Sequence, residues 1–173
     1  MIVNDETIHY TGGDIQRAVY SLSCEICRSI RLDNPLYLCI MNGGIYFFAD
    51  ITKLLPPGYC EFVKIQSYSD NVQGKLTFVS PIEFPKGFKQ IIIFDDICDT
   101  GNTLSALVDI LKQECKADIY TAVAIYRDRQ DSTFKPDFAA ITINNDVFFA
   151  GYGLDDKGYD RNLPYIYDVN GGE

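Results

Sequence analysis

Hydrophobic and polar residues alternate along the chain with two different periods. Short apolar runs bounded by Gly, Pro, Asn and Asp predict buried strands, and apolar residues three and four apart predict amphipathic helices. The predicted helices cover residues 14–31, 45–55 and 104–111, and the predicted strands cover residues 36–41, 60–66, 76–79, 91–94, 119–125, 138–143 and 147–150. Strands that alternate with helices favour an α/β fold, a mostly parallel twisted sheet with helices on both faces.

The run from residue 91 to residue 104 carries the most specific chemistry. A buried-type strand is followed by seven residues that could bind an anionic sugar, before a helical pattern begins: Asp95, Asp96, Asp99, Thr100, Gly101, Asn102 and Thr103. A helix N-terminus presents free N–H groups and a partial positive charge, so it can bind a phosphate. Carboxylates at the end of a parallel strand can accept hydrogen bonds from sugar hydroxyls or face a hard cation. The plain alternative is an acidic turn with Asp99 as a helix cap.

Composition narrows the function classes. The chain has 173 residues, enough for one domain with a proper core, and a formal net charge of −9. That charge argues against a nucleic-acid surface. No apolar run is long enough to cross a membrane and the first ten residues lack a signal pattern, so we expect a cytoplasmic protein that does not bind membranes. An anionic substrate would need local cations, either Arg and Lys or bound Mg²⁺.

The cysteines and the histidine exclude two common kinds of site. Six cysteines are present but no secretion signal, which favours reduced thiols, and Cys24 and Cys27 fall within a helical pattern. His9 is the only histidine, so a zinc site lacks ligands and a Ser-His-Asp or Cys-His nucleophile is not expected. The helix that contains Cys24 and Cys27 is expected to be capped by Asp14, after Gly12 and Gly13.

Two further segments resemble binding loops. Asn42 and Gly43 lie in a glycine turn between a buried strand and a helix, which could also be an ordinary βα connection. The C-terminal segment offers aromatics that could stack on a flat base, a glycine pair, an acid and an Arg: Phe148, Phe149, Gly151, Gly153, Asp155 and Arg161. Taken alone, this segment could also be an edge strand with core phenylalanines and a Tyr-rich surface tail.

The run 91–104 resembles the phosphoribosyl-pyrophosphate (PRPP) signature of the type I phosphoribosyltransferases. The other two segments resemble the hypoxanthine-guanine branch of that family, and the three occur in the family's order between residues 36 and 166. The resemblance implies one phosphoribosyltransferase domain over residues 1–173, with a small hood from the terminal segments. It also implies Mg²⁺, PRPP and a purine base as ligands, and a homodimer or homotetramer.

The resemblance implies a role for each matching position. Asp95 and Asp96 would bind the ribose, the loop 99–103 the 5′-phosphate, and Asp99 would be the general base or acid at the purine. Pyrophosphate would be bound by Asn42, Gly43 and Arg161, the purine by Phe148, the Phe149 backbone and Asp155, and Mg²⁺ by Asp155, Asp95 and Asp96. Ser67 and Tyr68 would belong to a closing loop.

Two departures from the family pattern affect these expectations. Asn42 stands where the family has Lys, and the family's non-proline cis peptide would fall between Asn42 and Gly43. The family Lys that faces the purine 6-oxo group corresponds to Tyr126 by an ungapped count, or to Arg127 after a one-residue deletion. The expected activity is therefore salvage of hypoxanthine or guanine, with a xanthine-preferring enzyme or a non-catalytic PRPP- or nucleotide-binding regulator as alternatives.

Overall fold

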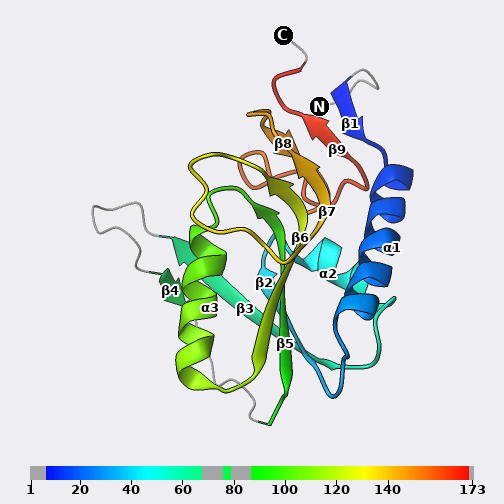
Figure 1. Cartoon of the computed structure of the whole chain (residues 1–173). Helices are drawn as coiled ribbons and strands as arrows, with labels where there is room; N and C mark the ends of the chain where they lie inside the picture. Colours follow the sequence, from blue (N-terminus) through cyan, green and yellow to red (C-terminus); the bar gives the residue numbers. More distant parts are fainter. Residues whose placement is uncertain (1–6, 68–75, 79–86, 172–173) are drawn as a thin grey trace.

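The main sheet has six strands in the order β4-β3-β2-β5-β6-β7 (Figure 1). The structure is a computed structural model, and it describes residues 7–67, 76–78 and 87–171. β4 runs antiparallel to β3, and all other neighbours are parallel. The strands are β2 (Leu36–Met41), β3 (Tyr59–Ser67), β4 (Leu76–Phe78), β5 (Gln90–Cys98), β6 (Asp118–Arg127) and β7 (Phe138–Ile143). The predicted mostly parallel α/β sheet is confirmed.

Helices cover both faces of this sheet. α3 (Asn102–Glu114) lies on one face, and α1 (Gly12–Ser29) and α2 (Ile45–Thr52) lie on the other (Figure 1). Ile91 and Ile93 of β5 belong to the core under α3, whereas Ile92 and Phe94 belong to the core under α1 and α2. Successive side chains of a strand point to opposite faces, so an unbroken apolar run is what a doubly covered strand requires.

The first helix begins with a different cap from the one expected. Thr11 is the N-cap, and its hydroxyl accepts a hydrogen bond from the N–H of Asp14. The Asp14 carboxylate accepts the N–H of Thr11 in return, at 3.0 Å, so the two residues form a capping box. The prediction that Asp14 is the N-cap was therefore wrong, because Asp14 is the third residue after the N-cap. α1 ends at Ser29 rather than residue 31, and α2 ends at Thr52 rather than residue 55.

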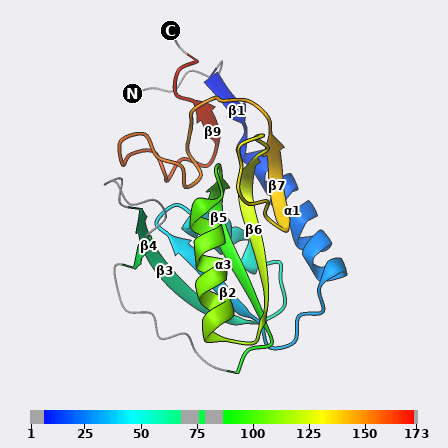
Figure 2. The same ribbon diagram turned by 60° about the vertical axis from the view of Figure 1, so that its left-hand side comes forward.

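A second, antiparallel sheet is built from the two ends of the described chain. Its order is β1-β9-β8, with β1 at Ile8–Tyr10, β9 at Ile166–Asp168 and β8 at Phe149–Ala150. It lies beyond the carboxyl ends of β5 and β6 in both views (Figures 1 and 2), as the expected hood does. The predicted strand 147–150 is shorter than expected, because only its last two residues pair with β9. No helix within the described ranges is both long and apolar enough to cross a bilayer.

Candidate active site

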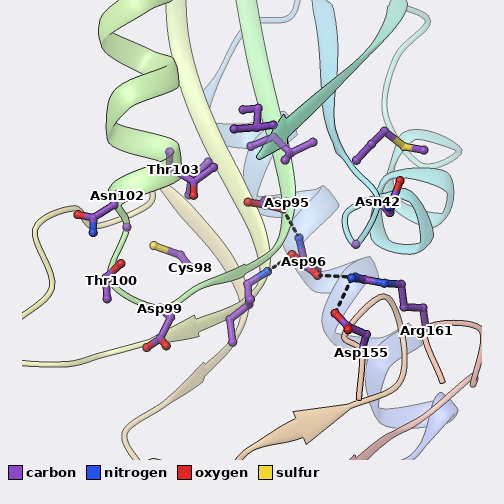
Figure 3. A pocket seen from close by; sticks show the side chains of 17 residues that line it. Asn42, Asp95, Asp96, Cys98, Asp99, Thr100, Asn102, Thr103, Asp155 and Arg161 are labelled. Carbon is purple, nitrogen blue, oxygen red and sulfur yellow. Dashed lines mark hydrogen bonds and ion pairs between the residues drawn. The ribbon is translucent and has the colours of Figure 1, made fainter. Parts of the chain in front are cut away.

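A pocket of about 350 Å³ opens at the carboxyl ends of β2 and β5, facing the hood (Figure 3). Parallel sheets usually bind ligands at this edge, because the loops that leave the strands converge there. Most of the predicted site residues line it: Asn42, Gly43, Asp95, Asp96, Asp99, Thr100, Gly101, Asn102, Thr103, Asp155 and Arg161. Segments more than a hundred residues apart in sequence therefore contribute to one cavity.

One wall of the pocket is the N-terminus of α3. The first helical hydrogen bond of α3 joins the Ser105 N–H to the Gly101 carbonyl at 2.9 Å, so the preceding N–H groups have no partner within the helix. Gly101 has a φ of 80°, and a Cβ there would lie 2.5 Å from Cβ of Phe134. Glycine is thus required by both conformation and space. Thr100, Asn102 and Thr103 surround this helix end in Figure 3, which makes it suited to bind an anion.

Two adjacent carboxylates form the floor of the pocket. β5 runs further than predicted, to Cys98, so Asp95 and Asp96 belong to the strand itself. Asp95 is only 7% exposed; its Oδ1 accepts the Asp96 N–H at 3.0 Å, and Oδ1 of Asp96 accepts the Ile97 N–H at 2.9 Å. Burial raises the pKa of both carboxyl groups, and the charge of Asp96 raises that of Asp95 further. The positive charge that the protein places near the two carboxylates therefore does not offset the cost of ionising them.

This acid pair fits a hard divalent cation. One buried and one half-buried carboxylate, both with raised pKa values, gain from a cation that neutralises them, and oxygen donors are what Mg²⁺ prefers. In the part of the chain that the structure describes, no three acidic, His or Cys side chains converge on one point. A metal here would thus take few ligands from the protein and the rest from water and substrate oxygens.

The opposite wall joins the glycine turn to the C-terminal segment. A Cβ on Gly153 would lie 2.3 Å from the Gly43 carbonyl oxygen, so these two backbones are in direct contact. The cis peptide lies between Met41 and Asn42, one bond before the predicted position. The predicted position, between Asn42 and Gly43, was therefore wrong by one residue.

Arg161 is surrounded by acceptors of this wall. Its Nη1 donates to the Gly153 carbonyl at 2.6 Å and lies 3.9 Å from Oδ2 of Asp96, and its Nη2 pairs with Asp155 (Figure 3). A guanidinium held at the pocket edge by two acids can exchange those partners for the oxygens of an incoming phosphate. The arrangement therefore supplies a cation on the side opposite α3.

Asp155 lines the pocket, but the other four residues predicted to bind the purine do not. Tyr126 packs in the core under α3, with its hydroxyl donating to Asp128 at 3.3 Å. Arg127 instead approaches Asp99, with Nε 3.2 Å from its Oδ1. Phe148 is 51% exposed, whereas the side chain of Phe149 is buried, with its ring against His9 and Tyr10. Of the two positions left open, only Arg127 thus faces the predicted catalytic acid.

The remaining predictions concern the closing loop and the thiols. Ser67 ends β3, and Tyr68 lies outside the described residues. All six cysteines are free, as expected. Cys98 lines the pocket, but burial raises its pKa to about 11, so its thiol is protonated at neutral pH and is a poor nucleophile.

Two residues near the pocket were missed by the sequence analysis. Arg129 places Nη1 3.5 Å from Asp99, and its guanidinium is held by a bidentate pair with Asp131. Thr133 donates its N–H to the Thr100 carbonyl at 3.0 Å, and its hydroxyl lies 3.0 Å from Oδ1 of Asn102. The polar composition of residues 127–135 indicated only a loop, and no spacing signal linked that loop to the helix end it supports.

Comparison with known proteins agrees with this geometry. A family model described as the phosphoribosyl transferase domain matches residues 10–157. The hypoxanthine-guanine phosphoribosyltransferase of Aquifex aeolicus is 30% identical over 161 residues, which cover 90% of each chain. The hypoxanthine-guanine-xanthine phosphoribosyltransferase of Tritrichomonas foetus is 26% identical over 168 residues, which cover 93% of this chain and 90% of that one.

Solved structures show the same fold. A hypoxanthine-guanine phosphoribosyltransferase from Bacillus anthracis superimposes with a TM-score of 0.86 at 24% identity, and the match covers 97% of this chain and 99% of that one. The family model spans most of the chain, and the pocket occupies the edge of the sheet where the signature residues meet. The chain therefore belongs to the phosphoribosyltransferase family.

Proposed function

We propose that the protein is a purine salvage enzyme that transfers the 5-phosphoribosyl group of PRPP to a 6-oxopurine. Hypoxanthine, and guanine as a second base, would give IMP or GMP and pyrophosphate. One observation carries the proposal: an anion-binding helix end, a buried acid pair and a pyrophosphate-type loop with its Arg line the same pocket. The relatives in A. aeolicus and T. foetus are both named for hypoxanthine and guanine, and the second is also named for xanthine, which supports a 6-oxopurine as the base.

The two walls of the pocket suit the two ends of PRPP. The N–H groups and hydroxyls of residues 100–103 bind the 5′-phosphate, and Asp95 and Asp96 accept hydrogen bonds from the ribose hydroxyls. Asn42, Gly43 and Arg161 bind the pyrophosphate on the far side. The sugar is thereby held with its anomeric carbon between the leaving group and the base, which supplies the orientation that the transfer needs.

Mg²⁺ would be held at Asp95 and Asp96, with Asp155 at the edge of the same pocket. When bound, the metal neutralises charge on the pyrophosphate as it leaves. Asp155 pairs with Arg161 in this structure, so the proposed metal and pyrophosphate sites would adjoin at these two residues. The Asn42 side chain carries no charge, unlike the family Lys, which leaves Arg161 as the main protein cation there.

Asp99 is the general base or acid in this proposal, and Phe148 is the surface on which the purine stacks. The Asp99 side chain is 47% exposed and lines the pocket, so it is accessible to a bound base. The backbone of Phe149 would read the edge of the ring. Ser67 and Tyr68, the second outside the described residues, would belong to a segment that closes over the site and excludes water from the sugar, which becomes cation-like as pyrophosphate leaves. A cytoplasmic homodimer or homotetramer remains our expectation for the assembled enzyme.

The test is a spectrophotometric assay with PRPP and Mg²⁺ against hypoxanthine, guanine, xanthine and adenine in parallel. Turnover of hypoxanthine or guanine, lost when Mg²⁺ is chelated, is the expected result. Turnover of xanthine alone would replace the proposal by a xanthine-preferring enzyme. PRPP binding without turnover of any base would replace it by a PRPP-binding regulator.

A further inference from the structure

We propose that Arg127 is a positioning residue: it fixes the Asp99 carboxylate and, with the same guanidinium, the loop that leads to Phe148. It therefore does not itself bind the purine. The functional part of this inference rests on the proposed function, since Asp99 and Phe148 are the residues that would meet the base. The structural part, that Arg127 holds two segments together, can be tested without turnover.

The first observation is where the donors of Arg127 point. The residue ends β6 and is only 6% exposed. Nη1 donates to the carbonyl of Asn145 and Nη2 donates to the carbonyl of Val147 at 2.9 Å. Both carbonyls belong to the connection between β7 and β8, directly before Phe148. Two hydrogen bonds from one planar group fix the course of that loop.

The second observation concerns the third nitrogen. Nε lies 3.2 Å from Oδ1 of Asp99, yet it is the one buried side-chain nitrogen or oxygen in the described residues without a hydrogen bond of good geometry. A buried guanidinium is costly unless it is paired, and Asp99 is the carboxylate within reach. Because Asp99 is half exposed, its side chain can rotate to complete the bond. The charge of Arg127 thus favours one orientation of the Asp99 carboxylate.

That orientation distinguishes the two oxygens of Asp99. Arg129 also approaches Oδ1, at 3.5 Å, so both guanidinium groups face the same oxygen. Oδ2 is then the oxygen available to exchange a proton with the base. A carboxylate anchored through one oxygen presents the other in a fixed direction, which is what proton transfer over a short distance requires.

The same geometry removes Arg127 from base recognition. Each of its three nitrogens already faces an acceptor of the chain itself, and burial leaves little room for a further partner. A lysine cannot reproduce the arrangement, because a single ammonium cannot span two carbonyls and a carboxylate in one plane. The substitution Arg127→Lys therefore distinguishes the two roles. A lysine could still donate to the purine oxygen, but it could not hold both the Asp99 carboxylate and the loop before Phe148.

The experiment compares Arg127→Lys with Arg17→Lys, the same change at an α1 residue whose side chain is 74% exposed. Three quantities are measured: kcat/KM for hypoxanthine, PRPP affinity by calorimetry, and hydrogen exchange of the peptide that spans residues 144–149. For Arg127→Lys we expect a loss of about tenfold or more in kcat/KM for the base, as for other misplaced catalytic groups. We also expect PRPP affinity within about twofold and faster exchange of residues 144–149, as for loss of two backbone contacts.

Unchanged exchange of residues 144–149 in Arg127→Lys, or a PRPP loss as large as the base loss, would overturn the proposal. So would activity equal to that of Arg17→Lys, which would mean that residue 127 reads the base. If Arg127→Lys does not fold, Asp99→Asn tests the other end, since removing the counter-ion should also speed exchange of residues 144–149. If the wild-type protein turns over no purine, the proposed function fails while the exchange data still decide the clamp.

Discussion

A Cβ atom on Gly43 would lie 1.8 Å from Oδ2 of Asp96. The glycine turn after β2 and the second acid of β5 are therefore in contact, although they are more than fifty residues apart in sequence. This contact brings the proposed pyrophosphate loop against the proposed ribose site, so the two halves of PRPP meet where these residues touch. Any side chain at position 43 has to displace the carboxylate.

Gly43→Ala should therefore weaken substrate binding more than it weakens the fold. Asp96 must move, and with it the acceptor for the ribose. We expect PRPP affinity to fall by about tenfold or more, the cost of losing an oriented charged partner, as measured by titration calorimetry in Mg²⁺. Gly13→Ala offers a matched control: Gly13 lies in the first turn of α1, and a Cβ there makes only ordinary contacts, the nearest at 3.5 Å from Nη1 of Arg17. Equal PRPP affinities in the two variants would contradict the prediction.

Asp99→Asn should remove turnover and leave PRPP bound. General acid–base catalysis is worth about 100-fold or more, and an amide cannot take up the proton. The 5′-phosphate contacts of the loop come from N–H groups and hydroxyls that the change leaves in place. Single-turnover kinetics with hypoxanthine would measure the loss, and calorimetry the remaining PRPP affinity. A kcat within about twofold of the wild-type value would show that Asp99 has no role in proton transfer.

The buried Asp95 carboxylate should lower the free energy of unfolding of the ligand-free protein. Burial and the charge of Asp96 raise the pKa of Asp95 above its ordinary value of 3.8, so the folded state holds a proton that the unfolded state releases. The free energy of unfolding then falls as pH rises through the raised pKa. Asp95→Asn, which carries no charge, should have a higher Tm than the wild type, by a margin that widens as the pH rises from the ordinary value of 3.8 toward the raised pKa.

Thermal unfolding without ligands measures that margin, with Asp118→Asn, a change at an exposed acid, as the control. A margin that narrows as pH rises would show that the buried pair does not repel in the folded protein. The double variant Asp95→Asn with Asp96→Asn should also bind PRPP more weakly in Mg²⁺. Calorimetry that gives an unchanged affinity would mean that the ribose lies elsewhere.

Thr133→Val should weaken binding at the proposed phosphate site, because it removes a hydroxyl that contacts Asn102. The Thr133 hydroxyl lies 3.0 Å from both the Thr100 carbonyl and Oδ1 of Asn102. The Thr133 N–H already donates to that carbonyl, so the hydroxyl can donate to Oδ1 of Asn102. The side-chain N–H groups of Asn102 then remain available to the phosphate. Losing one hydrogen bond, about 1 kcal/mol, should weaken ribose 5-phosphate binding about fivefold. Thr133→Ser should keep the affinity, and a loss equal to that of the valine variant would point to packing instead.

Much of this architecture could be predicted because each element has a local cause. The buried strands carry unbroken apolar runs, and the loop 99–103 combines its ligands within five residues. The pocket could be anticipated in the same way, since the carboxyl ends of parallel strands meet at one edge of the sheet.

The rest depends on contacts between irregular segments, which no periodicity encodes. The sequence left two residues, Tyr126 and Arg127, as candidates for the position of the family Lys, because a strand's alternation tells its two faces apart only once its register is known. The contact of Thr133 with Asn102 depends on how a loop packs against a helix end that lies about thirty residues earlier in the sequence. The cap of α1 was misplaced because Thr11 and Asp14 share one motif, and either is a good N-cap by composition.

The pairing of β1 with β9 has a consequence for how the protein is made. During synthesis the first strand leaves the ribosome early, but its partner is the last element of the described chain to emerge. Until then a nascent chain can assemble the main sheet and the helix end at α3, while β1 stays unpaired and Arg161 has no anchored hood. A product that ends before β9 would lack the central strand of the small sheet, and the segment with Asp155 and Arg161 would then be anchored at one end only.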